Sequence, residues 1–262
     1  MANKILKVLV IGDTHDSPHI PDKSRFGWFA KHIKKTKPDY VVQIGDFATF
    51  DSCTHYIRDD SYTAKIDKPI FMKDIESLDE AMEEFQYHLK DFKIKKYLTL
   101  GNHERRMWRK EDSNPSFYGM CQKEFFGTCK KYDWEVIPYG KYLMLGGVGF
   151  IHAPINPMGK EYGGEASERQ VANKSKIDIV FGHSHRAQDN RVSKISPIKN
   201  DFTRIINVGC ALPHNHIESY AKHSLTGWTY QICELKIWDN HIQEVNNISM
   251  QTLEREYGKK KS

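Results

Sequence analysis

The sequence predicts an α/β fold, and three observations support this prediction. Short apolar runs, most of them followed by glycine, recur along the chain and are typical of buried strands. Between them lie stretches with apolar residues spaced three and four apart, which is the spacing of amphipathic helices. Beyond residue 200 the pattern changes to successive strand-like runs.

Five of the apolar runs end in polar residues that could bind a metal. The runs span residues 5–11, 40–44, 97–100, 148–151 and 177–181. The polar residues that follow them are Asp13 and His15, Asp46, Asn102, His152, and His183 and His185. Open α/β sheets place their ligand sites beyond the carboxyl ends of the strands, so we expect these side chains to meet.

Helices are expected over residues 26–35 and 75–89, each with apolar residues on one face, and a further helix is expected from Glu104 to about residue 110. Residues 51–74 mix aromatic, acidic and basic side chains, and we interpret them as an insertion near the site. The role of residues 51–95 and 110–140 stays open, because neither contains a motif.

The last part of the chain predicts three strands, over residues 203–208, 227–237 and 242–248. The Asp239-Asn240 pair between the last two runs indicates a β-hairpin. No linker rich in proline, glycine or serine interrupts the chain. We therefore expect one domain over residues 1–262, with the motifs in 5–212 and the C-terminal strands and hairpin in 203–250.

The composition is that of an ordinary soluble globular protein. The chain has 262 residues, of which 39% are hydrophobic and 28% charged, with a formal net charge of +5. No apolar run is long enough to span a membrane, and no leader pattern is present, so we expect a cytoplasmic protein without a membrane partner. Five scattered cysteines without a CxxC pair argue against disulfides and a zinc knuckle. The basic Lys259–Lys261 end is interpreted as solvated.

The candidate ligands suit two hard or borderline divalent cations. Asp13 and His15 are two residues apart, which puts both side chains on one side of an extended segment, and His183 and His185 repeat this spacing. Carboxylate, amide and imidazole donors suit manganese, iron or zinc. Two cations held close together need a shared carboxylate, and Asp46 is the natural candidate for it.

In their order along the chain, these blocks resemble those of the calcineurin-like metallophosphoesterase superfamily. Gly12-Asp13-Thr14-His15, Gly45-Asp46, Gly101-Asn102-His103-Glu104, His152 and Gly182-His183-Ser184-His185 are similar to its D-x-H, G-D, G-N-H-[DE], H and G-H-x-H motifs. The resemblance implies a four-layer α/β/β/α sandwich of two mixed β-sheets flanked by helices. It also implies that one metal is bound by Asp13, His15 and His185, the other by Asn102, His152 and His183, and both by Asp46.

Two stretches depart from the family pattern. Asn207-Val208-Gly209-Cys210 stands where the family has N-P-G-S. After Asp46, where many members have a second acid three residues on, the next acid is Asp51, and the arginine that follows it in protein phosphatases is absent. The second departure weakens a protein phosphatase assignment.

The resemblance implies a hydrolase of phosphate esters, either a phosphodiesterase or a phosphomonoesterase. Two divalent cations, with Mn²⁺ the first candidate and Fe, Zn, Mg and Ni the alternatives, would lie about 3.5–4 Å apart and hold a bridging hydroxide as the nucleophile. His103 would protonate the leaving group, or would only contact the metal ligands without taking part in the reaction. Glu104 would orient His103 or cap the following helix.

Several basic residues could bind the substrate. Arg105, Arg106 and Arg109 follow the third motif, and Arg186 follows the last; each could contact a phosphate or lie on a solvated basic face. Asp16 is a candidate partner for a metal-bound histidine. His55, His214 and His216 are not expected to bind metal.

The substrate class stays open at this stage, and so does the oligomeric state. A small phosphate ester or a nucleotide is the main expectation. A DNA or RNA nuclease of the repair-exonuclease type is the alternative, supported by the basic charge and the arginines after Glu104. A non-catalytic scaffold is disfavoured, because all seven candidate ligands and His103 are present.

Overall fold

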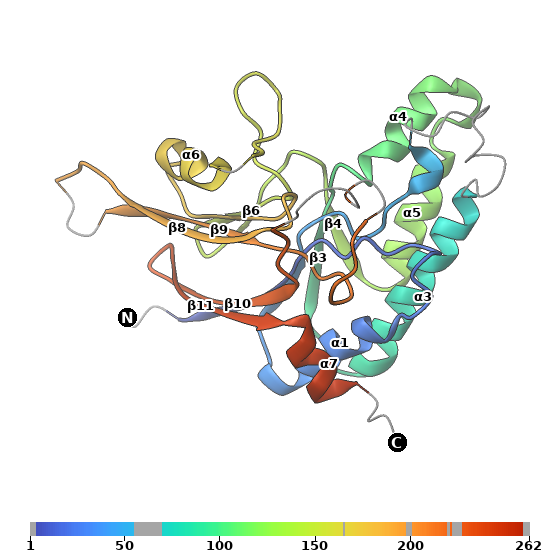
Figure 1. Ribbon diagram of the computed structural model, residues 1–262, viewed down its shortest axis with the longest axis horizontal. Helices are drawn as coiled ribbons and strands as arrows, with labels where there is room; N and C mark the ends of the chain where they lie inside the picture. Colours follow the sequence, from blue (N-terminus) through green and yellow to red (C-terminus); the bar gives the residue numbers. More distant parts are fainter. Residues whose placement is uncertain are drawn as a thin grey trace.

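The computed structural model describes residues 4–54, 70–164, 166–197, 201–218, 221 and 227–258, and the fold is described for these residues. Two mixed β-sheets lie face to face, with helices on the outer side of each (Figure 1). This arrangement confirms the predicted α/β sandwich.

The larger sheet has six strands in the order β11-β10-β1-β2-β3-β4. The strands are β1 (Leu6–Ile11), β2 (Tyr40–Gln43), β3 (Lys95–Thr99), β4 (Trp134–Ile137), β10 (Gln231–Trp238) and β11 (His241–Ser249). Strands β1 to β4 run parallel, and β10 and β11 add an antiparallel edge. The carboxyl ends of β1, β2 and β3 therefore lie at one edge of this sheet.

The smaller sheet has five strands in the order β5-β6-β7-β9-β8. They are β5 (Leu143–Leu145), β6 (Val148–Phe150), β7 (Ile179–Phe181), β8 (Ala187–Ser193) and β9 (Phe202–Val208). Strands β6, β7 and β9 are parallel. The ends of β1 and β9 meet, because Asp13 forms a parallel bridge with Cys210.

Helices cover both outer faces. They are α1 (Ser24–Thr36), α3 (Phe71–Leu89), α4 (Arg105–Ser113), α5 (Met120–Lys131), α6 (Ser167–Lys174) and α7 (Met250–Tyr257), with short 3₁₀ turns η1 (Asp51–Cys53) and η2 (Pro115–Phe117). In Figure 1, α1, α3, α5 and α7 flank the larger sheet and α6 lies on the smaller one. None of the described helices has both the length and the apolar character of a membrane-spanning segment.

Strand β1 shows why its run is apolar throughout. Leu9 and Ile11 pack into the core shared with the helices, whereas Val8 and Val10 pack into the core between the two sheets. A strand covered on both faces needs apolar residues at every position. The two cores fix how the sheets stack, and with that they fix where the strand ends meet.

Most predicted elements are present, with small shifts in their ends. The helix expected to start at Ile75 begins at Phe71, and the hairpin turn is formed as predicted, with positive φ at Asp239 and Asn240. Residues 55–69, which include His55 and most of the predicted insertion, lie outside the described residues, as do Lys259–Lys261.

Candidate metal centre

The seven predicted ligands come together where the strands of both sheets end. Asp13 and His15 follow β1, Asp46 follows β2, Asn102 follows β3, His152 follows β6, and His183 and His185 follow β7. Groups of their donor atoms lie within 4.8 Å of one another. Strand ends that are far apart in sequence therefore form one polar cluster.

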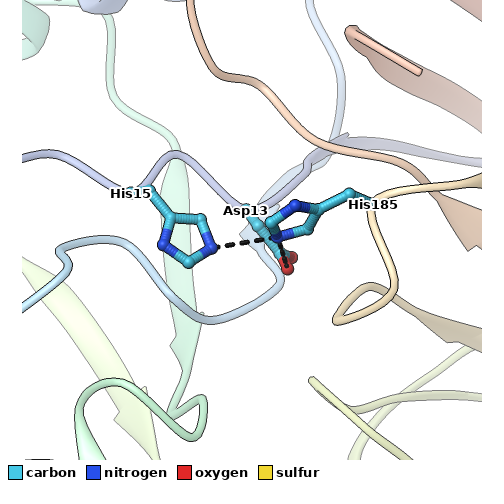
Figure 2. A group of neighbouring side chains, drawn as sticks. All are labelled: Asp13, His15 and His185. Carbon is cyan, nitrogen blue, oxygen red and sulfur yellow. Dashed lines mark hydrogen bonds and ion pairs between the residues drawn. The ribbon is translucent and has the colours of Figure 1, made fainter. Parts of the chain in front are cut away.

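One half of the cluster consists of Asp13, His15 and His185 (Figure 2). The Nε2 atoms of His15 and His185 are 3.0 Å apart, and His185 Nε2 is 3.2 Å from Asp13 Oδ2. All three residues are at most 2% exposed. We call these residues the first half of the centre.

The second half consists of Asn102, His152 and His183. The Oδ1 atom of Asn102 is 2.9 Å from His152 Nε2 and 2.9 Å from His183 Nδ1. The Nδ1–H group of His152 donates to the Ile44 carbonyl at 3.1 Å, which leaves Nε2 facing the cluster. These three donor atoms thus converge on one point.

Asp46 lies between the halves. Its Oδ2 atom is 3.3 Å from His152 Nε2 in the second half and 3.8 Å from His15 Nε2 in the first. Its Oδ1 atom accepts a hydrogen bond from the His103 backbone N–H at 2.8 Å, which fixes the carboxylate. One oxygen of Asp46 can therefore reach both halves.

The donor set fits divalent cations. Two carboxylates and four imidazoles lie together, all of them buried except the half-buried His183, and burying such groups without compensation is costly. Among the described residues none donates a hydrogen bond to the buried Asp13 Oδ1 atom. Carboxylate, amide and imidazole donors suit manganese, iron, zinc and related metals, and the set does not choose between them.

The two halves differ in protonation. Burial and the neighbouring His103 and His185 hold the pKa of His15 well below its usual value. Burial also lowers the pKa of His152, but the Asp46 and Asp13 carboxylates outweigh this effect and raise it to about 10. Without a cation, the first half is thus neutral at His15, while the second half holds a proton on His152.

The backbone around the predicted ligands adopts rare conformations. His15, Asp46, His183 and His185 have φ values of 42°, 49°, 71° and 58°. Left-handed backbone at such residues costs about 1–3 kcal/mol each and is concentrated at functional sites. A β-carbon on Gly101 would lie 2.1 Å from Asp46 Oδ1, so only glycine allows the two loops to approach this closely.

Glu104 braces two of the ligand loops, and both of its expected roles are wrong. Its buried carboxylate accepts hydrogen bonds from the backbone N–H groups of Asp46, Phe47 and Gly101 at 2.8–3.0 Å and from Ala48 at 3.3 Å. Glu104 lies at the N-cap position of α4, but its side chain makes no capping hydrogen bond there, and the His103 ring is held by Thr49 instead. No pattern along the chain predicts this role, because the donors belong to two separate loops.

His103 points its ring toward the cluster. Its Nδ1–H group donates to the Thr49 carbonyl at 3.0 Å, while Nε2 lies 3.1 Å from Arg106 and 4.0 Å from Asp46 Oδ2. Burial and the Arg106 guanidinium lower the pKa of His103 to about 3. The backbone carbonyl of Thr49 therefore orients this ring.

The other predicted residues lie farther from the cluster. Arg106 donates to the Thr49 carbonyl and Asp51, Arg105 stacks on Tyr139, and Arg109 is exposed on α4. Arg186 donates to the Gly164 carbonyl. Asp16 pairs with Lys23, Arg25 and Ser77, so its expected contact with a ligand histidine is wrong. His214 and His216 contact Gln251 and Glu218.

The sequence also does not predict a pair of hydrogen bonds that supports the loop of His183 and His185. The Asn207 side chain donates to Ser184, between His183 and His185, and to the buried Glu168 of α6. In the sequence, Asn207 belongs to a stretch that is similar to the family pattern, and no spacing connects it with Glu168. This pair of hydrogen bonds holds the loop after β7 against α6.

Solved structures with similar folds are distant in sequence. They include Yfce, a phosphoesterase from E. coli, with 13% identity, TM-score 0.40 and coverage of 93% of this chain and 100% of that one. Vps29 from Entamoeba histolytica, complexed with Zn²⁺, has 12% identity, TM-score 0.36 and coverage of 94% and 99%. Vacuolar protein sorting 29 from Cryptosporidium parvum has 13% identity, TM-score 0.40 and coverage of 94% and 98%.

No curated protein matches the sequence. The family profile described as calcineurin-like phosphoesterase matches residues 6–187, which is more than half of the chain and contains all seven predicted ligands. This family typically binds divalent metals, and its members are generally phosphoester hydrolases. The chain belongs to the calcineurin-like phosphoesterase family.

Proposed function

We propose that this protein hydrolyses phosphate esters with two divalent cations bound side by side. The position of Asp46 Oδ2, within 3.8 Å of a histidine in each half of the centre, is the observation that carries the proposal. One carboxylate oxygen that reaches two sets of donors is what a pair of neighbouring cations needs. Mn²⁺ is the first cation to test.

In this proposal the candidate ligands divide into two sets. Asp13, His15 and His185 would hold one cation, and Asn102, His152 and His183 the other, with Asp46 shared. When bound, the two cations would neutralise the phosphate charge and lower the pKa of a water molecule for attack on phosphorus. Glu104 keeps the loops of Asp46 and Asn102 together through its backbone contacts.

His103 is the proposed proton donor to the leaving oxygen. The Thr49 carbonyl fixes the ring through Nδ1, so that Nε2 faces the cluster and could reach a bound ester. In the free protein Arg106 opposes a proton on this ring. A phosphate anion bound beside both groups would pair with Arg106, offset its charge and favour the protonated imidazole, so that the proton is available when substrate is bound.

A metal titration with several substrate classes tests the proposal. The panel includes p-nitrophenyl phosphate, bis-p-nitrophenyl phosphate, cyclic nucleotides, and single- and double-stranded DNA and RNA. Hydrolysis that depends on added Mn²⁺ is expected for at least one small ester, and preference for a nucleic acid would instead support the nuclease alternative. Absence of hydrolysis of every substrate with Mn²⁺, Fe²⁺, Zn²⁺, Mg²⁺ and Ni²⁺ would refute the proposal that this protein is an enzyme. The Asp46→Ala variant, purified in parallel, controls for contaminating phosphatases.

A further inference from the structure

The outer side of His183 faces a carboxylate from another part of the chain. The Nδ1 atom of His183 points to Asn102 and the centre, whereas its Nε2 atom lies 3.9 Å from Glu161 Oε2. The other oxygen of Glu161 accepts a hydrogen bond from the Tyr139 hydroxyl. Arg105 in turn covers the Tyr139 ring, with its Cζ atom 4.7 Å from the ring centroid. A line of contacts thus runs from α4 to the second half of the centre.

The loop that carries Glu161 starts from a residue of the same centre. After His152, the chain folds back on itself, and Ile155 forms an antiparallel bridge with Glu161. The Tyr162 N–H group donates to the Pro154 carbonyl at 2.8 Å, which closes the loop. The loop therefore holds the Glu161 backbone at a fixed place, and Tyr139 holds its side chain.

The two histidines of the second half are held at their outer nitrogens by different groups. The outer nitrogen of His152 donates to the backbone carbonyl of Ile44. The outer nitrogen of His183 faces only the Glu161 carboxylate among the contacts described for it. A histidine that binds a metal through one nitrogen usually donates the N–H of the other to a carboxylate or carbonyl, which fixes its tautomer and ring orientation.

We propose that Glu161 is a positioning residue for His183, which it orients so that Nδ1 is presented to the cation of the second half. The gap of 3.9 Å is longer than a direct hydrogen bond, so Glu161 acts through its charge and through a water molecule that can bridge the gap. The inference rests on the proposed function, because it takes His183 to be a ligand. Nothing in the motif pattern points to Glu161, which lies in a loop between the motifs.

Calorimetric Mn²⁺ titration of the full chain, together with metal content after dialysis, tests this role without measuring activity. Wild-type protein is expected to bind two cations. Glu161→Gln should weaken the weaker binding step by about tenfold or more and leave the tighter step unchanged. Glu161→Asp should recover part of this loss, and Tyr139→Phe should cause a smaller one.

Glu135→Gln is the matched control, because Glu135 is exposed on β4 and loses the same charge. Equal thermal melting of the metal-free variants shows that Glu161→Gln is folded. If wild type binds two cations and Glu161→Gln binds both with the same affinities as Glu135→Gln, the positioning role is refuted and the two-cation proposal stands. If wild type binds only one cation, both proposals are refuted.

Discussion

The two halves of the metal centre are held in place by different means. In the first half, Asp13, His15 and His185 are buried where the two sheets meet, and the side chain of His185 is only 3% exposed. In the second half, the His183 side chain is 25% exposed and is held on its outer side by Glu161, from a loop. A site enclosed by the core keeps its geometry without a cation better than one that depends on a loop. We therefore expect the second half to bind its cation more weakly.

The neighbours of the two halves also differ. His103 lies against the first half, with its ring centroid 4.4 Å from that of His15, and Arg106 contacts the His103 ring. Glu161, Tyr139 and Arg105 lie behind the second half. Arg106 thus contacts a neighbour of the first half, and Arg105 contacts a neighbour of the second half. Substitutions of these two arginines therefore test the halves separately.

Asp46→Ala is expected to have the largest effect, because it removes the only side chain proposed to bind in both halves. The variant should lose metal at both positions and lose all activity above background. Metal analysis after dialysis, alongside wild type, measures the loss. Full occupancy in this variant would contradict the shared role of Asp46, and loss of one cation only would assign Asp46 to a single half.

His103→Ala separates metal binding from chemistry. The variant should keep both cations, because His103 is not a proposed ligand, and its kcat should fall by about 100- to 10,000-fold, as is usual for loss of an acid–base group. Steady-state kinetics and metal analysis on the same preparation test this. His214→Ala, an exposed histidine bonded to Gln251, is the control. Wild-type turnover in His103→Ala would show that His103 is not the proton donor.

The pH dependence of metal binding should differ between the halves. With a pKa of about 10 in the free protein, His152 must release a proton before it can bind a cation. Affinity in the second half should therefore rise with pH below this pKa, by up to about tenfold per unit for one proton. Because the pKa of His15 is lowered, this residue is already neutral around pH 7 and releases no proton when a cation binds.

Calorimetry between about pH 6 and pH 8, in buffers of different ionisation enthalpy, measures both the affinities and the protons released. The stronger pH dependence should belong to the weaker binding step. Equal proton release in the two steps would mean that the halves have the same protonation, and the contrast between His15 and His152 would be wrong.

The sequence was sufficient for the fold and for the gathering of the candidate ligands, because both follow from short-range patterns. An apolar run such as residues 5–11 predicts a strand covered on both faces, and the polar residue after it then lies at the sheet edge. The roles of these residues as ligands, and the extent of one domain over residues 1–262, stay predictions.

Elements without their own apolar pattern were missed. Strand β8 (Ala187–Ser193) is polar and mostly solvent-facing, and it forms through its pairing with β9. The supporting roles of Glu104 and Glu161 also could not be predicted, because their partners are backbone groups and side chains that only the folded chain brings near. Patterns along a chain report which face is buried, and they do not report contacts between separate loops.

The smallest expected effect comes from the arginines of α4. Arg106→Ala should lower kcat/KM by about tenfold, which is about 1.4 kcal/mol of transition-state stabilisation, with both cations retained, because Arg106 reaches the first half only through His103. Arg105→Ala should instead slightly weaken metal binding in the second half, by loosening Tyr139. Arg109→Ala, a change at an exposed position of the same helix, should alter neither kcat/KM nor metal binding.

If Arg109→Ala lowers kcat/KM as much as Arg106→Ala, the whole basic face of α4 contacts the substrate. A nucleic acid contacts a longer stretch of basic surface than a small ester does, so this result would favour the nuclease alternative.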